Sequence, residues 1–343
     1  VSDEEGPGDR GFQRVYDPKT NYRRQEPGYH PPTTYEWDVY YKDYDRMLRQ
    51  VESYINPLGR DPDGRRQPSQ ILRKGYPNYT FYGKRDNPFG DGNTVDRALE
   101  ILDGLMDDPE AGTRPFMMYC GTVGPHDPYY APQEFLDLYR DLDVRLPENF
   151  RDSFLDKPNL HRRLKGLYAQ MTDGEQLDCL RHYLAFCSYE DHLFGRLLDR
   201  LEQAGRMDDT VVMVLSDHGD YAGDHGLWAK GLPCFDGAYH VPLLIGGAGI
   251  RRPARAEDAF VSLADIAPTI CDLAGIPYDT GRFSGRSLLP FLRGDDDEAA
   301  RERALRDAVY TQTNGNELYG IQRSVRTREW KFVYNGFDFD ELY

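Results

Sequence analysis

The sequence predicts an α/β protein in which a mainly parallel sheet is flanked by helices and followed by a small antiparallel C-terminal subdomain. Two short apolar runs, at 211–215 and 241–245, are typical of strands buried on both faces of a sheet. A long amphipathic segment from about residue 175 to 203 ends at Gly205 and predicts a helix that covers the sheet. After residue 295 the chain turns to short alternating pieces, AVYTQT, YGIQRSVRT and WKFVYN, which favour a small antiparallel sheet.

Composition limits the classes of function. Among 343 residues there are 58 acidic and 42 basic side chains, for a formal charge of −16, which argues against non-specific binding to nucleic acid or anionic membrane. An anionic substrate would therefore need a locally positive pocket. No apolar run reaches the length of a membrane span. The cysteines are scattered without CxxC spacing and are predicted to be mostly buried thiols: Cys120, Cys179, Cys187, Cys234 and Cys271.

The first part of the chain, 1–92, is predicted to be irregular and loop-rich, apart from an aromatic-rich amphipathic helix at 35–56. A helix follows at 95–106, with Asn93-Thr94 as its expected N-cap. After Pro115, a strand is predicted at 116–120. These elements and the later sheet are assigned to one large domain, 1–295.

The chain is organised around the stretch from Thr210 to Gly231, TVVMVLSDHGDYAGDHGLWAKG. Its apolar strand stops at Asp217-His218, and open α/β sheets place ligands at the carboxyl ends of their strands. A carboxylate oxygen and a neutral imidazole nitrogen can together hold a divalent cation. Lys230 would place a compact positive charge beside an anion that the metal also touches. The alternative is an ordinary polar strand end with a glycine-rich turn.

His126 lies in the loop GTVGPHDPYY, which leaves the strand predicted at 116–120. A histidine in a loop is commonly just solvated. If the two predicted strands belong to one sheet, however, the side chains of His126, Asp217, His218 and Lys230 should line one cleft.

Further along, a strand is predicted at 239–245, and FVSLADIAPTICDLAGI predicts a strand and then a helix with Pro268 near its start. After the charged run DDDEAARERALRD, the sequence changes to short β-rich segments. We therefore place a small α+β subdomain at 296–343, beside the larger domain.

The string SDHGDYAGDHGLWAKG closely resembles the sulfatase family of the alkaline-phosphatase-like superfamily, and PHDPY resembles that family's Pro-His-x-Pro-(Tyr or Phe) element. The resemblance extends over most of 93–343, including VSLADIAPT and GRSLLPFL. It implies that Asp217 and His218 are metal ligands and that Lys230, His126 and His225 contact a sulfate ester. It also implies a divalent metal, with Ca²⁺ expected and Mn²⁺ or Mg²⁺ as alternatives.

Three features of the sulfatase pattern do not occur in the sequence: a pair of metal-binding aspartates, the Gly-Lys-x-His motif, and the Cys/Ser-x-Pro-x-Arg signature. In sulfatases that Cys or Ser becomes formylglycine, whose hydrate attacks sulfur. We therefore expect the chain to be a sulfatase fragment, with formylglycine in a missing N-terminal part and a truncated C-terminal subdomain. Alone, it is expected to bind metal poorly and to be inactive.

The activity that this resemblance implies is metal-dependent hydrolysis of a small-molecule or carbohydrate sulfate ester, without nucleic acid or a membrane span. Phosphonate and phosphodiester esters share the tetrahedral geometry, so a phosphonate or phosphodiester hydrolase of the same superfamily is the first alternative. The second is a catalytically silent fragment that keeps the fold.

Overall fold

The structure is a computed structural model, and it describes residues 66–73, 76–107, 115–250, 259–293, 302–316 and 318–343. The irregular region and the helix predicted at 35–56 lie mostly outside these residues. In the first half, the strands are β1 (Gln70–Arg73), β2 (Tyr76–Thr80), β3 (Tyr82–Lys84) and β4 (Tyr129–Ala131). The helices there are η2 (Pro88–Gly90), α4 (Asp91–Met106), α5 (Gln133–Asp137), η4 (Glu148–Arg151), α6 (Asn159–Tyr168) and α7 (Asp173–Gln203).

The second half opens with β5 (Val211–Leu215), η5 (Asp224–Gly226), α8 (Asp236–Tyr239) and β6 (Leu243–Gly247). It continues with η6 (Leu263–Asp265), α9 (Ile266–Leu273), η7 (Thr280–Arg282) and α10 (Leu289–Leu292). The chain ends in β7 (Val309–Gly315), β8 (Tyr319–Arg326), β9 (Lys331–Asn335) and β10 (Glu341–Leu342).

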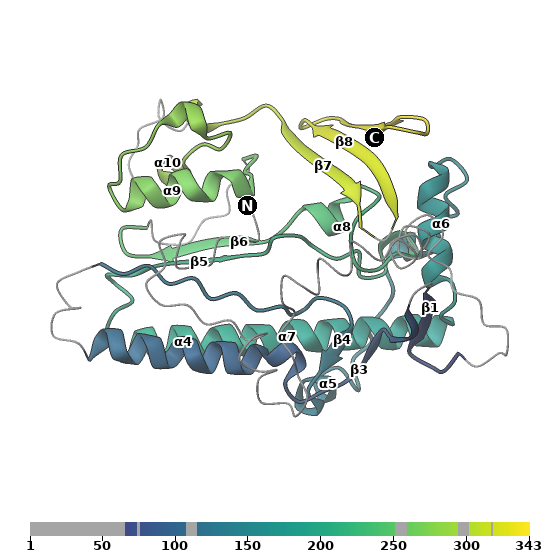
Figure 1. Ribbon diagram of the computed structural model, residues 1–343, viewed down its shortest axis with the longest axis horizontal. Coiled ribbons are helices and arrows are strands. Elements are labelled where there is room, and N and C mark those ends of the chain that lie inside the picture. The colour runs from purple at the N-terminus through teal and green to yellow at the C-terminus, as the bar shows by residue number, and fades with distance from the viewer. Residues whose placement is uncertain (1–65, 74–75, 108–114, 251–258, 294–301, 317) are drawn as a thin grey trace, which may run out of the picture.

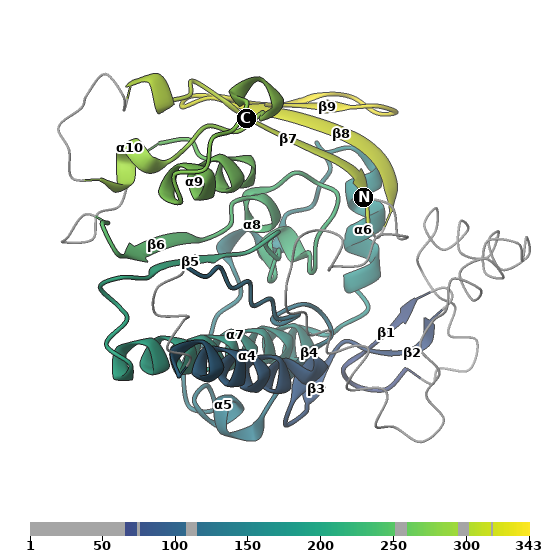
Figure 2. The same cartoon turned by 60° about the vertical axis from the view of Figure 1, so that its left-hand side comes forward.

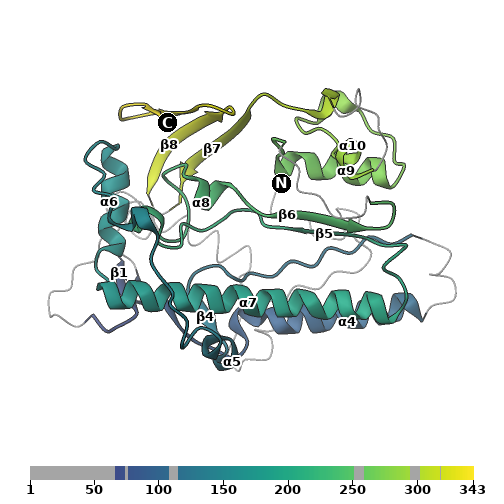
Figure 3. The same ribbon diagram turned by 180° about the vertical axis from the view of Figure 1, so that it is seen from behind.

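These elements form layers. Figures 1 and 3 show α4 and α7 side by side on one side of the β5–β6 ribbon, with α9 and α10 on the other side. The side chains of Leu243 and Ile245 on β6 pack against a small core that includes Phe291 of α10. The α/β class predicted from the sequence is therefore present, with helices on both sides of a ribbon.

Pairing within the described strands is mixed. β3 and β4 run parallel, whereas β5 and β6 run antiparallel, with Val211 opposite Gly247. The prediction that 211–215 and 241–245 are buried on both faces is wrong here, because Leu215 is 40% exposed and Leu244 is 61% exposed. In the described residues these two strands hydrogen-bond only to each other, so the ribbon has no neighbouring strands to shield its side chains, and the helices on its two sides leave part of each face uncovered.

Two further strand predictions are wrong. The segment 116–120 belongs to no helix or strand, and Met117 and Tyr119 are 65% and 77% exposed. Its apolar composition is that of a strand, but a strand also needs a hydrogen-bonded neighbour, and the described residues provide none. The segment before α9 is likewise coil leading into η6, and β6 begins at Leu243, just after Pro242, which lacks a backbone N–H.

The helix predicted at 175–203 is confirmed, and it begins two residues earlier, at Asp173. Thr172 and Glu175 form a reciprocal capping box: Glu175 N donates to Thr172 Oγ1 (3.3 Å) and Thr172 N donates to Glu175 Oε2 (2.8 Å). The helix predicted at 95–106 is also confirmed, but α4 starts at Asp91, after Gly90 in a left-handed conformation (φ 78°). Asp91 in the first turn replaces Asn93-Thr94 as the signal for the start of this helix.

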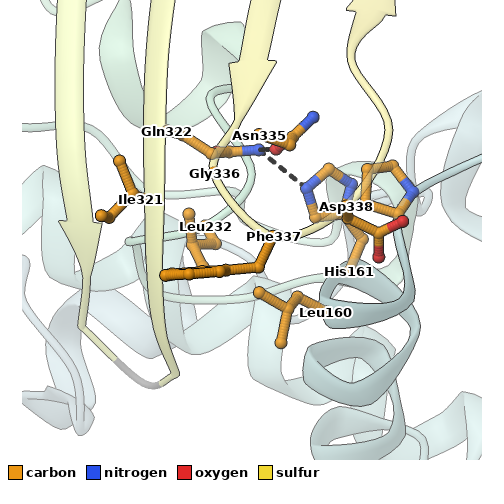
Figure 4. Close-up of a pocket in the computed structure, with 11 residues that line it drawn as sticks. Leu160, His161, Leu232, Ile321, Gln322, Asn335, Gly336, Phe337 and Asp338 are labelled. Carbon is orange, nitrogen blue, oxygen red and sulfur yellow. Dashed lines mark hydrogen bonds between the residues drawn. The ribbon is translucent and has the colours of Figure 1, made fainter.

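The three C-terminal strands predicted from alternation are confirmed as one antiparallel sheet in the order β10-β9-β8-β7. Figure 2 shows this sheet as a curved layer above α8 and beside α6. It meets α6 at a small cavity, where the Gln322 amide approaches His161 Nε2 (2.9 Å) and donates to Asn335 Oδ1 (2.6 Å) (Figure 4). This buried polar contact joins the C-terminal sheet to the helical part of the molecule.

Candidate functional site

The turn after β5 presents Asp217 and His218 together. Ser216 Oγ donates to the carbonyl of His218 (2.6 Å), and Gly219 N donates to Ala238 O (2.9 Å). A Cβ at position 219 would lie 2.1 Å from the carbonyl oxygen of Gly237, so only glycine fits there. The sequence thus folds into a tight turn that leaves the carboxylate of Asp217 88% exposed and 3.7 Å from His218 Nε2.

The ring of His218 is held in one tautomer. Its Nδ1 lies 2.8 Å from the carbonyl oxygen of Gly219 and must be the donor in that hydrogen bond, because a carbonyl can only accept. The Nε2 lone pair then faces the side of Asp217. Burial, and to a smaller extent Lys230, lower the pKa of His218, whereas the Gly219 carbonyl raises it; the net shift favours the neutral ring.

His126 and Lys230 form the other half of the site. The ammonium of Lys230 donates to His126 Nε2, while His126 Nδ1 donates to the carbonyl of Asp127 (2.6 Å). The rings of His126 and His218 meet edge to face, with centroids 5.7 Å apart. The structure therefore brings together His218 and Lys230 with His126, which lies 104 residues before Lys230 in the sequence, and Asp217 is beside them.

The loop that carries Lys230 is anchored from below by a carboxylate that the sequence analysis did not single out. Asp220 accepts hydrogen bonds from Tyr129 Oη (2.6 Å), Ala222 N (2.8 Å) and Ala229 N (3.1 Å). Burial raises the pKa of Asp220 to about 7, against the lowering effect of these donors. Its position in the Ser-Asp-His-Gly-Asp string was the signal that could have identified it.

Trp228 fixes the same loop from within. Its side chain is fully buried, and its indole N–H donates to Gln176 Oε1 on α7 (2.6 Å). Tyr129 lies against the indole, with ring centroids 5.8 Å apart. The Gly-Leu-Trp-x-Lys string is thus an anchor followed by a cation: the tryptophan enters the core, and the lysine two residues later emerges at the site.

His225 makes different contacts. It has a positive φ of 53°, and its Nδ1 lies 2.8 Å from Asp152 Oδ2. Its ring packs on Phe235, with centroids 4.2 Å apart. Hydrogen bonds from Phe154 N and His225 outweigh burial and lower the pKa of Asp152. The contacts described for His225 do not join it to His126, His218 or Lys230.

A metal ion would need more ligands than the Asp217–His218 pair. In the part of the chain that the structure describes, no three His, Cys, Asp or Glu side chains gather so as to hold a metal. The pair itself suits a divalent cation, because the carboxylate is accessible and the imidazole Nε2, 3.7 Å from it, is left with a lone pair. The described residues also contain no helix long and apolar enough to cross a membrane.

Comparison with known proteins places the chain in a class. It is similar to a phosphonate monoester hydrolase of Agrobacterium radiobacter, with a TM-score of 0.62 and 21% identity over 90% of this chain and 61% of that one. It is also similar to BT4656 in complex with its substrate D-glucosamine-2-N,6-O-disulfate, with a TM-score of 0.60 and 20% identity over 74% of this chain and 62% of that one. The chain thus has the alkaline-phosphatase-like fold.

The family follows from the sequence comparisons. The Sulfatase family model matches residues 3–276, and the model of the N-sulphoglucosamine sulphohydrolase C-terminal region matches 223–343. The choline-sulfatase of Rhizobium meliloti (strain 1021) is 33% identical over 67% of this chain, and the arylsulfatase K of Gallus gallus is 30% identical over 64%. The chain belongs to the sulfatase family. It spans 44% of the length of each of these two relatives.

Proposed function

We propose that the protein containing this chain hydrolyses a sulfate ester, with Asp217 and His218 as ligands of a divalent metal and Lys230 and His126 at the sulfate group. The observation that carries the proposal is the joining of Lys230, His126 and His218 in one cluster beside the exposed carboxylate of Asp217. Family membership supports the same reaction class.

The roles follow from the hydrogen bonds of each side chain. His126 accepts a hydrogen bond from the ammonium of Lys230 through Nε2 and is held through Nδ1 by the Asp127 carbonyl, so it fixes the direction of the cation. A fixed ammonium stabilises negative charge that develops on sulfate oxygens, and it needs no reorganisation during the reaction. The Gly219 carbonyl keeps His218 in the tautomer that a metal ligand requires.

A bound cation would polarise sulfate oxygens as a Lewis acid. We propose Ca²⁺, because the family site that the resemblance implies is otherwise rich in oxygen ligands, which suit a hard cation. Mn²⁺ and Mg²⁺ are the alternatives, Mn²⁺ because His218 adds a nitrogen ligand. The formylglycine nucleophile that the family resemblance implies is assigned to none of the 343 residues. His225, which packs on Phe235 and Asp152, remains a proposed contact of the substrate through the resemblance alone.

The proposed substrate class is a small-molecule or carbohydrate sulfate ester. Relatives named choline-sulfatase and arylsulfatase, and a similar structure that holds a sulfated glucosamine, support this class. A phosphonate or phosphodiester ester is the second candidate, supported by two phosphonate monoester hydrolases among the similar structures, with TM-scores of 0.60 and 0.62.

The test is an assay of the full-length protein with aryl sulfate, choline sulfate, sulfated glucosamine and an aryl phosphonate monoester, alongside metal analysis. We expect the highest kcat/KM on a sulfate ester, and loss of both metal and turnover in Asp217→Asn. Preference for the phosphonate would establish the second candidate. A metal-loaded protein inactive on every ester would indicate a silent member of the family.

A further inference from the structure

The loop that carries His126 is held by a carboxylate from another element. Asp91, in the first turn of α4, is 1% exposed and accepts hydrogen bonds from Val123 N and Gly124 N, each at 2.9 Å. His126 N in turn donates to Val123 O (3.2 Å), which closes the turn. One carboxylate thus binds two successive amides of the turn that presents His126 to Lys230.

A second carboxyl group lies directly beneath the same turn. Glu190 of α7 is hydrogen-bonded to the carboxyl of Asp91. A Cβ added at Gly124 would lie 2.2 Å from Glu190 Oε1 and 2.5 Å from Phe186, so the turn rests on this side chain. Glu190 Oε1 is buried and receives no hydrogen bond from any donor in the described residues.

Two buried carboxyl groups in contact cannot both be charged without strong repulsion, so the pair must share a proton. Asp91 accepts two amide hydrogen bonds and lies at the positive end of a helix, and both features stabilise its charge. The proton therefore resides on Glu190, which donates to Asp91, and the carboxyl group of Glu190 is also hydrogen-bonded to the side chain of Thr122. Burial, followed by the charge of Asp91, raises the pKa of Glu190 to about 8.

The other titratable groups around the pair stay neutral through this range. Cys120 precedes the turn, and Cys187 and Tyr189 lie on α7. Burial is the largest cause that raises the pKa of Cys120 and of Tyr189, and neighbouring negative groups raise it further. Burial likewise raises the pKa of Cys187, and the pKa values of Cys187 and Tyr189 each reach about 12. The charge of Arg196, further along α7, opposes the rise in the pKa of Tyr189. The Arg196 guanidinium also forms an ion pair with Asp96.

We propose that Asp91 and Glu190 form a proton-sharing pair that positions His126, and that loss of the shared proton releases the turn and weakens the contact between His126 and Lys230. Both are positioning residues, because they act through the turn 123–126. The effect of the Asp91–Glu190 pair on catalysis rests on the proposed function, whereas its effect on the conformation of the turn 123–126 does not.

The principal variant is Glu190→Gln, whose amide donates to Asp91 at every pH. In the wild type, kcat/KM should fall on the alkaline side as the pair loses its proton, to about a tenth of its plateau one pH unit above the pKa. Glu190→Gln should keep its plateau at that pH. Glu202→Gln, an exposed position on the same helix, is the matched control and should follow the wild type.

A second variant tests the anchor itself. Asp91→Asn places an amide N–H against one of the two backbone donors, which should displace the turn and lower kcat about 10- to 100-fold, with a smaller change in KM. An alkaline limb that is unchanged in Glu190→Gln, or full activity in Asp91→Asn, would overturn the proposal.

A readout independent of turnover separates this inference from the proposed function. In the full-length protein with ¹³C-labelled histidine, the ring signal of His126, assigned by its loss in His126→Gln, should shift as the pH passes about 8. The shift should be absent in Glu190→Gln and present in Glu202→Gln. If it occurs in a protein inactive on all esters, the pair is established and the sulfatase proposal fails; if the wild type shows no such shift, the pair is refuted.

Discussion

At the scale of single residues, backbone carbonyl groups fix which ring nitrogen of each histidine in the site is left without a proton. The carbonyl groups of Asp127 and Gly219 each accept a hydrogen bond from Nδ1 of a histidine, so that both Nε2 atoms are left for function. One of them accepts from Lys230, and the other faces the carboxylate of Asp217. The positive and the anionic halves of the site are thereby kept apart, although the two rings touch.

Lys230→Met tests the positive half. The variant keeps the length of the side chain but removes the cation, so kcat should fall about 100- to 1,000-fold while the melting temperature stays within a few degrees. Lys84→Met, at an exposed position on β3, is the control and should retain full activity. Steady-state kinetics on the best sulfate ester provide the measurement, and a change smaller than threefold would contradict the assigned role.

Asp220→Ala tests the anchor beneath the loop. The change leaves the hydroxyl of Tyr129 and the amide of Ala222 without their acceptor, whereas Ala229 N keeps its hydrogen bond to Tyr129 Oη (3.1 Å). Each buried unpaired group costs about 1–3 kcal/mol. We expect the free energy of unfolding to fall by about 3 kcal/mol or more in denaturant titrations. A loss below 0.5 kcal/mol would show that water replaces the carboxylate.

At the scale of elements, α7 organises the molecule. Its first turns supply Gln176 to Trp228, its middle supplies Glu190 to the turn of His126, and its face packs along α4. Its start is fixed twice by Glu175, which completes the capping box and also binds Arg66 through both oxygens, at 2.7 and 2.8 Å.

The pH dependence of this helix start can be predicted. The hydrogen bond from Arg66 is the largest cause that lowers the pKa of Glu175, from 4.5 to about 2. A lowered pKa in the folded state means that the stabilisation is complete above pH 4.5 and is lost as the pH falls towards 2. Thr172→Ala should cost about 1 kcal/mol at pH 7. The difference in unfolding free energy between wild type and Glu175→Gln, followed by denaturant titration, should shrink from pH 5 to pH 3.

How far the sequence predicts each element depends on whether its signal is local. The helix α7 and the strands β7, β8 and β9 carry their periodicity within themselves and were predicted well. The segment 116–120 has the composition of a strand, but strand formation depends on a partner that no local pattern specifies. The pairing of Asp91 with Glu190 could not be predicted from the sequence for the same reason, because only the fold brings them together. The contacts of His225 with Phe235 could not be predicted from a glycine-rich loop.

At the scale of the whole molecule, the C-terminal sheet is attached to α6 through a buried polar chain. His161, Gln322, Asn335 and Glu341 are each at most 7% exposed, and the Asn335 amide joins Gln322 to Glu341 (3.0 Å). His161 accepts from Gln322 through Nε2 and therefore carries its proton on Nδ1 (Figure 4). Burial is the main cause that lowers the pKa of His161 to about 3.

This attachment should weaken in acid. The unfolded histidine binds a proton near pH 6.5, whereas the folded one does not until about pH 3, so stability is lost as the pH falls below 6.5. Hydrogen exchange should show amides of β8 and β9 less protected at pH 5 than at pH 7, after correction for the intrinsic rate. His161→Leu should abolish this pH dependence, whereas His240→Leu, at an exposed position, should leave it intact.

The buried indole of Trp228 gives the molecule a built-in optical probe. The sequence contains Trp37, Trp228 and Trp330, and Trp330 is 57% exposed. With Trp37 and Trp330 replaced by phenylalanine, the remaining emission would come from a ring hydrogen-bonded to α7 and two residues from Lys230. Its emission maximum should be blue-shifted because the indole is shielded from water. The maximum should move to longer wavelength when the loop detaches from the core. Stopped-flow fluorescence could then time the arrival of a ligand at Lys230 without any chromogenic substrate.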